Sequence, residues 1–232
     1  MKVVILAGGF GTRISEHTDQ LPKPMIKIGP KPIIAHIMDI YIKHGYHDFI
    51  IAAGYKGSIL KKYFKNQKKK INVKVIDTGL NSQTGGRIRR LKKYIGSSKF
   101  FLTYGDGLAN INIKKLLALH NKNKSQVTVS TVRPPARFGF LRLSADKVIS
   151  FKEKSQLDVG WINGGFFVME PSFIDYIKSD QTYLEREPLE QIAKEKKISA
   201  YKHYGFWQCM DTKRDKKILD QLVRRKKKPW LV

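Results

Sequence analysis

The sequence of 232 residues contains a single cysteine, Cys209. One thiol excludes an internal disulfide framework and a cysteine-rich zinc site, and it is typical of a protein from a reducing compartment. The chain also lacks a long apolar segment, and Met1 leads directly into an apolar run without a charged leader or a small-residue cleavage site. These features favour a cytoplasmic protein with no membrane partner.

Acidic residues are scarce: 19 Asp and Glu stand against 45 Lys and Arg, which gives a formal net charge of +26. Such an excess favours polyanionic partners, including nucleic acid. The lysines, however, are spread along the whole chain rather than gathered on one element, as expected for solvated faces. We therefore expect an anionic small substrate and no nucleic acid, and we keep a basic nucleic-acid-binding protein as the alternative from another class.

The composition otherwise resembles that of a globular protein. Hydrophobic residues make up 41% of the chain, with 12 Phe, 10 Tyr and 3 Trp, which excludes a disordered chain. The length suffices for a sizeable core, and there is no linker or internal repeat. We expect residues 1–232 to form a single domain.

Apolar runs alternate with segments of helical spacing. Strands are expected at residues 2–7, 49–53, 73–76, 100–104, 126–132, 140–143, 148–151, 161–169 and 201–204; helices at 33–43, 56–65, 113–122, 171–177, 187–194, 213–226 and from about 14; and a polar loop at 77–87. This alternation implies right-handed crossovers. We predict an α/β fold with a doubly wound, mostly parallel (mixed) Rossmann-like sheet, and a small antiparallel subregion at residues 140–151.

The first two dozen residues predict a phosphate-binding loop. An apolar strand that ends in Leu6 and Ala7 is followed by Gly8, Gly9, Gly11 and Thr12. Glycines allow a close approach of the backbone to a ligand, and successive N–H groups in such a turn bind anions. Arg13 would add a fork of donors, and Lys23, which lies between two prolines, a point charge. The alternative is a tight strand-to-helix turn with surface cations.

Two other phosphate loops are excluded. The sequence has no Gly-x4-Gly-Lys-Ser/Thr motif, and Gly9-x-Gly11 lacks the third glycine of the dinucleotide fingerprint.

Two aspartates are candidate ligands for a hard cation. Asp106 lies between two glycines at the end of an apolar strand, and Asp211 precedes a predicted helix. Magnesium usually takes one or two carboxylates together with phosphate oxygens and water. The structural alternatives are a Gly-Asp-Gly turn and a helix N-cap.

From end to end, the chain resembles the sugar-phosphate nucleotidylyltransferases, and within them the cytidylyltransferase branch. Nine ordered motifs carry this resemblance: Leu6-Ala7-Gly8-Gly9, Pro22-Lys23-Pro24-Met25, Asp77-Thr78-Gly79, Thr84-Gly85-Gly86-Arg87, Tyr104-Gly105-Asp106-Gly107, Arg137-Phe138-Gly139, Phe151-Lys152-Glu153-Lys154, Ile162-Asn163-Gly164-Gly165-Phe166-Phe167, and Gly205-Phe206-Trp207-Gln208 with Met210-Asp211-Thr212.

The resemblance implies a role for each site residue. Arg13 and Lys23 would be catalytic, and Asp106 and Asp211 would hold Mg²⁺. The nucleotide would contact Leu6, Ala7, Gly8, Gly9, Gly11, Thr12, Arg13, Lys23, Ser82, Thr84, Gly85, Gly86, Arg87, Thr103 and Gly105. The sugar phosphate would contact Gly139, Glu153, Lys154, Asn163, Gly164 and Gly165. Residues 1–107 would form the nucleotide-binding half, and residues 108–232 the sugar-phosphate half with the C-terminal helix.

The resemblance further implies CTP and glucose 1-phosphate as substrates, CDP-glucose and pyrophosphate as products, and a homo-oligomer. UTP or dTTP as donor, or another phosphorylated acceptor, is the alternative within the family. The chain departs from these relatives between Phe64 and Asp77, where it has a short lysine-rich connection in place of a longer insertion.

Overall fold

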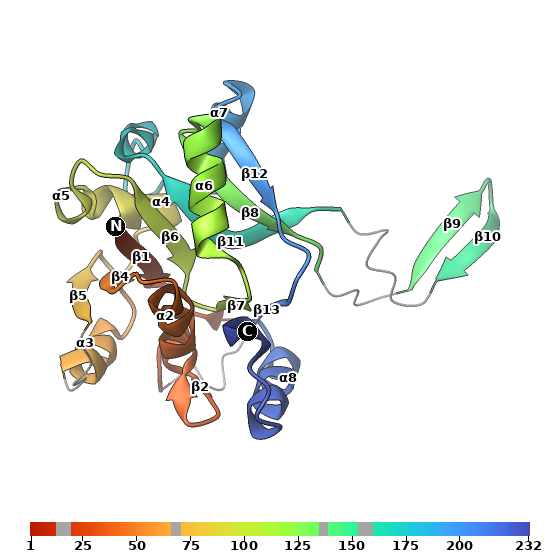
Figure 1. The fold of residues 1–232 in the computed structure, drawn as a ribbon, viewed down its shortest axis with the longest axis horizontal. Coiled ribbons are helices and arrows are strands. Elements are labelled where there is room, and N and C mark those ends of the chain that lie inside the picture. Colours follow the sequence, from red (N-terminus) through yellow and green to blue (C-terminus); the bar gives the residue numbers. More distant parts are fainter. Residues whose placement is uncertain (13–19, 66–70, 135–138, 153–159) are drawn as a thin grey trace.

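A seven-stranded sheet runs through the centre of the computed structural model, which describes residues 1–12, 20–65, 71–134, 139–152 and 160–232 (Figure 1). In spatial order, its strands are β12 (Ile198–Lys202), β8 (Val127–Val132), β11 (Ile162–Met169), β6 (Phe100–Tyr104), β1 (Lys2–Ala7), β4 (Asp48–Ala53) and β5 (Asn72–Asp77). Neighbours pair in parallel, except that β11 is antiparallel to both β6 and β8. The predicted doubly wound, mixed sheet is confirmed.

The central strands are buried on both faces. Along β1, Val3 and Ile5 belong to one hydrophobic cluster, whereas Val4 and Leu6 belong to another. Because successive side chains of a strand point to opposite faces, the two clusters lie on opposite sides of the sheet. This burial explains why the strand reads as a continuous apolar run rather than as an alternation.

Helices cover each face. The first cluster includes residues of α2 (Ile33–Lys43), α3 (Gly57–Lys65), α6 (Ile113–Asn123), α8 (Lys213–Arg224) and the 3₁₀ turn η4 (Pro229–Leu231). The second includes residues of α4 (Thr84–Arg90), α5 (Lys92–Ile95), α7 (Glu187–Lys194) and the 3₁₀ helix η3 (Pro171–Tyr176). Within the described ranges, no helix is both long and apolar enough to cross a bilayer.

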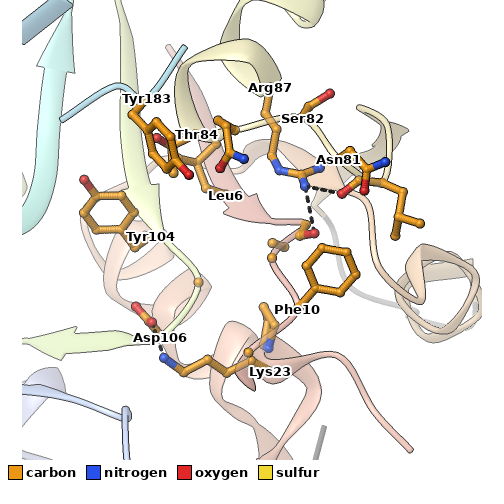
Figure 2. A pocket seen from close by; sticks show the side chains of 18 of the residues that line it. Leu6, Phe10, Lys23, Asn81, Ser82, Thr84, Arg87, Tyr104, Asp106 and Tyr183 are labelled. Carbon is orange, nitrogen blue, oxygen red and sulfur yellow. Dashed lines mark hydrogen bonds and ion pairs between the residues drawn. The ribbon is translucent and has the colours of Figure 1, made fainter. Parts of the chain in front are cut away.

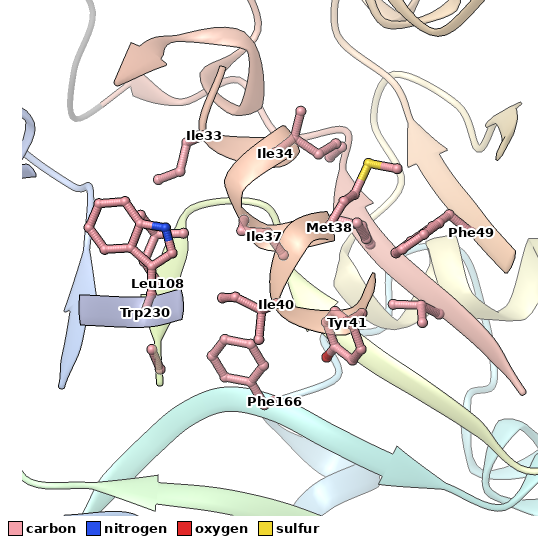
Figure 3. Close-up of a cluster of buried hydrophobic side chains, with 14 of the residues drawn as sticks. Ile33, Ile34, Ile37, Met38, Ile40, Tyr41, Phe49, Leu108, Phe166 and Trp230 are labelled. Carbon is pink, nitrogen blue, oxygen red and sulfur yellow. The ribbon is translucent and has the colours of Figure 1, made fainter. Parts of the chain in front are cut away.

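Helix α2 anchors the first cluster (Figure 3). Six of its buried apolar side chains belong to this cluster: Ile33, Ile34, Ile37, Met38, Ile40 and Tyr41. Trp230 of η4 is buried in the same cluster, and Lys43 Nζ donates to Leu231 O over 2.8 Å. Each such aliphatic side chain contributes about 1.5–3 kcal/mol on burial, so α2 also fixes the end of the chain to the core.

Three predicted elements differ from the structure, and the helix predicted from about residue 14 begins outside the described residues. The loop predicted for residues 77–87 ends earlier, because α4 begins at Thr84. The helix predicted for 171–177 is the 3₁₀ helix η3, and the strand predicted for 201–204 is β12, which begins at Ile198. Tertiary contacts explain the first and last cases: α4 packs its glycines on the backbone of residues 180–184, and β12 takes its register from β8.

Three small sheets flank the large one. β9 (Phe140–Ser144) and β10 (Lys147–Lys152) form the predicted antiparallel pair, and β2 (Lys27–Ile28) pairs with β3 (Lys31–Pro32). The third pair, β7 (Gly107–Ala109) with β13 (Trp207–Cys209), was not predicted. Figure 1 shows the β9–β10 hairpin projecting from the body of the molecule.

Buried His36 on α2 predicts a loss of stability in acid. Burial lowers its pKa to about 4, against the opposing effect of the hydrogen bond between its Nε2 and Ile28 O. Between about pH 6.5 and 4 the unfolded state therefore binds more protons than the folded state, so the free energy of unfolding falls as the pH falls. From pH 7 to pH 4 the loss due to this residue should be about 3 kcal/mol.

Urea unfolding of the wild type and of His36→Gln over this pH range measures the effect. The variant should lose less stability on acidification than the wild type. Parallel curves for the two proteins would contradict the assignment.

Candidate active site

The predicted phosphate loop lines a cavity with a volume of about 760 Å³ (Figure 2). The loop follows β1 directly, at the carboxyl edge of the parallel strands, where α/β sheets present their ligand groups. Of the predicted nucleotide contacts, eleven line this cavity: Leu6, Ala7, Gly8, Gly9, Gly11, Thr12, Lys23, Ser82, Thr84, Arg87 and Gly105.

Another part of the cavity wall is built from the segment after β5. Leu80, Asn81, Ser82 and Gln83 line the cavity there, before α4 begins at Thr84. The segment adds backbone N–H and C=O groups and short polar side chains to those of the glycine loop. A nucleotide could therefore lie with its phosphates on the loop and its base against this segment.

Lys23 and the two predicted metal ligands meet at one point. Lys23 Nζ donates to Asp106 Oδ2 over 2.6 Å and to Asp211 Oδ1 over 2.7 Å. Burial alone would lower the pKa of Lys23, but the two carboxylates outweigh burial and the net pKa is raised. A protonated ammonium group thus holds two carboxylates that are 83 and 188 positions away in the sequence.

The unpredicted β7–β13 pair brings these aspartates together. Asp106 lies between β6 and β7, and Asp211 lies between β13 and α8. Gly107 faces Cys209 in the register, and Met210 N donates to Asp106 O over 2.9 Å. The pair of carboxylates is therefore brought together by a short sheet, because the two residues are distant in the sequence.

The carboxylates fit a hard divalent cation. Both already direct an oxygen toward the same cationic atom, and Mg²⁺ is commonly held by one or two carboxylates with phosphate and water oxygens. The part of the chain that the structure describes contains no group of three His, Cys, Asp or Glu residues suited to a metal. A metal held by these two carboxylates would complete its coordination with phosphate or water oxygens.

A second cavity of about 420 Å³ adjoins the first. Its walls are formed by Thr84, Thr103, Tyr104, Asp106, Gly107, Asn163, Gly164, Gly165, Phe166, Glu185, Trp207, Cys209 and Asp211. Thr84, Tyr104 and Asp106 line both cavities. The carboxylates therefore lie where two ligands could meet.

The predicted sugar-contacting strand is bent where it enters this cavity. The register of β11 on β8 shifts between Asn163 and Phe167, and Gly165 has a φ of +80°. A Cβ at Gly165 would lie 2.8 Å from Cδ2 of Tyr104, so any other residue would collide with that ring. Asn163 Oδ1 accepts from Gly165 N over 2.8 Å, which fixes the amide at the wall.

Several site residues were not predicted. Glu185 accepts from Tyr104 Oη over 2.7 Å and from Thr84 Oγ1 over 2.6 Å, and so joins the two cavities. Trp207 Nε1 donates to Gly164 O over 2.8 Å. The motifs contained Tyr104 and Trp207 without assigning them a role, whereas Glu185 lies in a polar stretch that gave no signal.

Other predicted residues lie elsewhere. Gly85 and Gly86 line neither cavity; a Cβ on Gly86 would lie 2.1 Å from Asp180 O, so these glycines serve close packing of α4. Thr103 lines the second cavity rather than the first. Gly139 directly precedes the β9–β10 hairpin, and the catalytic candidate Arg13 and the sugar-phosphate candidates Glu153 and Lys154 lie outside the described residues.

Arg87, predicted to border the base, has its guanidinium directed into the cavity wall (Figure 2). The residue is only 4% exposed, and burial lowers its pKa. Its Nη atoms donate to backbone carbonyls, including Gly8 O over 2.9 Å and Gly79 O over 2.7 Å.

The sequence matches the nucleotidyl transferase family over residues 2–211. It is 46% identical, over 253 aligned positions, to a glucose-1-phosphate cytidylyltransferase of Salmonella typhi, with 99% of this chain and 98% of that one covered. A probable glucose-1-phosphate cytidylyltransferase of Bacillus subtilis is 39% identical, with both chains covered over 100% of their length. A solved structure of a putative glucose-1-phosphate thymidylyltransferase from Bacillus anthracis has the same fold, with a TM-score of 0.74 at 19% identity. The superposition covers 97% of this chain and 95% of that one.

Proposed function

The chain belongs to the nucleotidyl transferase family, and on this premise we propose that it transfers the cytidylyl group of CTP to glucose 1-phosphate, giving CDP-glucose and pyrophosphate. The observation that carries the proposal is the convergence of Lys23, Asp106 and Asp211 at the junction of two cavities. The relatives at 46% and 39% identity support the choice of CTP and of the glucosyl acceptor.

We assign the larger cavity to CTP and the smaller one to the sugar phosphate. The glycine loop after β1 suits the triphosphate, and the segment from Leu80 to Thr84 suits the base. Asn163, Gly164 and Gly165 suit the sugar hydroxyls, with an amide and accessible backbone groups. This assignment gives residues 1–107 the nucleotide and residues 108–232 most of the acceptor; the proposed roles of Arg13, Glu153 and Lys154 rest on the sequence.

The reaction is one displacement. An oxygen of the sugar phosphate attacks the α-phosphorus of CTP, the bond from that phosphorus to the bridging oxygen breaks, and pyrophosphate leaves with the electron pair. A phosphate monoester is mostly ionised near neutrality, so no general base is required. The protein contributes alignment of the two phosphates and positive charge, which Lys23 supplies at the junction.

Nucleotidyltransferases of this family generally use a divalent metal ion. We propose that Asp106 and Asp211 hold Mg²⁺, which would neutralise phosphate charge when bound. Lys23, whose Nζ contacts both carboxylates, would stand beside the same site.

Release of pyrophosphate tests the proposed reaction. Purified protein with Mg²⁺ is supplied with CTP, UTP, dTTP, GTP or ATP, each with the 1-phosphates of glucose, galactose or mannose. CTP with glucose 1-phosphate should be the best pair by at least about a hundredfold, because a pocket built on base hydrogen bonds leaves buried groups unpaired with the wrong base. A preference for UTP or dTTP would refute the cytidylyl assignment.

Loss of either carboxylate tests the metal assignment. Asp106→Asn and Asp211→Asn should each lower turnover by at least about a hundredfold, since each removes a ligand of the metal ion that would offset phosphate charge. Asp175→Asn is the matched control, because that carboxylate is 65% exposed and pairs with Lys92 on the surface. Full activity of the wild type and of both site variants in a chelator would contradict the assignment.

We further propose that the chain forms a homo-oligomer. In the projecting hairpin, Leu143 faces Val148 and Leu141 faces Phe151 across the strands, and these side chains are 45–66% exposed. A two-stranded hairpin is marginal in water by itself, so an apolar face of this kind favours a covering surface.

Light scattering at micromolar concentration measures this assembly. The measured mass of the wild type should exceed that of one chain. The mass of the double variant Leu143→Gln with Val148→Thr should shift toward that of one chain. Arg142→Gln, on the other face of β9, should keep the mass of the wild type. A monomeric wild type, or a double variant that assembles fully, would contradict the proposal.

A further inference from the structure

We infer that Arg87 is a positioning residue for the phosphate loop: its buried guanidinium sets the orientation of the Gly8 peptide and joins three strand ends, and it does not contact the base. The inference rests on the proposed assignment of the larger cavity to a nucleoside triphosphate.

Arg87 binds five acceptors from three segments. Nη1 donates to Ala53 O over 3.3 Å, Thr78 Oγ1 over 2.9 Å and Gly79 O over 2.7 Å. Nη2 donates to Gly8 O over 2.9 Å and to Leu80 O over 3.2 Å. These acceptors follow β1 and β5 or, for Ala53, end β4, so a single side chain connects the ends of three neighbouring strands.

The space around the guanidinium is closed by glycines. A Cβ at Gly8 would lie 2.2 Å from Arg87 Nη1, and a Cβ at Gly54 would lie 2.4 Å from the same atom. The guanidinium thus lies directly behind the loop. The requirement for Gly8 then comes as much from the arginine behind it as from a ligand in front of it.

The hydrogen bonds on Gly8 O determine where an N–H group points. This oxygen accepts from Arg87 Nη2 and, over 3.1 Å, from Tyr55 N, both on the wall side. In a trans peptide unit the C=O and the following N–H point in opposite directions. With the carbonyl held in the wall, the N–H of Gly9, which is exposed and lines the cavity, is directed to the ligand side.

The charge of Arg87 also favours an anion in front of the loop. The acceptors named above are neutral carbonyl and hydroxyl groups, and the charged groups that act on the guanidinium, Asp77 and Arg90, have opposite signs. The positive charge of Arg87 therefore lies behind the loop that is proposed to bind the triphosphate, where screening by water is weak. Lysine could supply the charge, but its three donors on one atom cannot span the planar set of acceptors.

Binding of inorganic pyrophosphate separates positioning from base contact, because pyrophosphate has no base. Calorimetry should give a Kd for pyrophosphate with Mg²⁺ that is about ten- to hundredfold higher for Arg87→Lys than for the wild type. The Kd values of CTP and UTP should rise by the same factor, so that their ratio is unchanged. Arg90→Lys, on the same helix but 46% exposed and paired with Asp180, should bind pyrophosphate like the wild type.

A base-contacting role for Arg87 predicts the reverse: the Kd for pyrophosphate should be unchanged and the ratio of the Kd values of CTP and UTP should change. An unchanged Kd for pyrophosphate, a changed ratio, or a wild type that does not bind pyrophosphate overturns the inference. If Arg87→Lys does not fold, Thr78→Val replaces it as the test, since this variant removes one acceptor of Arg87 and retains the arginine. Thr78→Val should raise the Kd for pyrophosphate and leave the ratio of the Kd values of CTP and UTP unchanged. These measurements need no turnover, so an inactive wild type would refute the proposed function and leave this test intact.

Discussion

Burial of the central strands on both faces is the constraint on which the rest of the structure depends. Side chains of β1 alternate between two apolar clusters, so polar chemistry is confined to the strand ends. At those ends, backbone carbonyls leave the sheet ladder and need new donors. Arg87 donates to the carbonyls of Gly8 and Gly79, which follow β1 and β5, and to that of Ala53, the last residue of β4, so ordinary hydrogen-bond satisfaction shapes this wall of the larger cavity.

The parts predicted from the sequence are those whose cause is local. The apolar run of β1, the helical spacing of α2 and the glycine loop carry their own signals within a few residues, and the structure has them where expected. The two aspartates were also predicted, as the ligands of one Mg²⁺ ion. Their convergence on Lys23 depends on pairing between residues about a hundred positions apart.

The features that escaped prediction depend on distant partners. β7 and β13 are three residues each, too short for a periodic signal, and exist because each pairs with the other. Helix α4 begins with two glycines, which disfavour a helix, and it is held by the backbone of residues 180–184. Glu185 is one acidic residue in a polar stretch, and its position only becomes meaningful once Tyr104 and Thr84 are beside it.

These distant contacts also connect the two cavities. Thr84, at the start of α4, donates to Glu185, which accepts from Tyr104, and Asn163 Nδ2 donates to Tyr104 Oη over 3.2 Å. This chain of hydrogen bonds runs from the proposed base wall to the proposed sugar wall and passes beside Asp106, which lines both cavities. Because both oxygens of Glu185 are engaged, a shift of either wall must break or lengthen one of these bonds. The two walls are therefore held at a fixed separation, which is what a direct displacement between two bound phosphates requires.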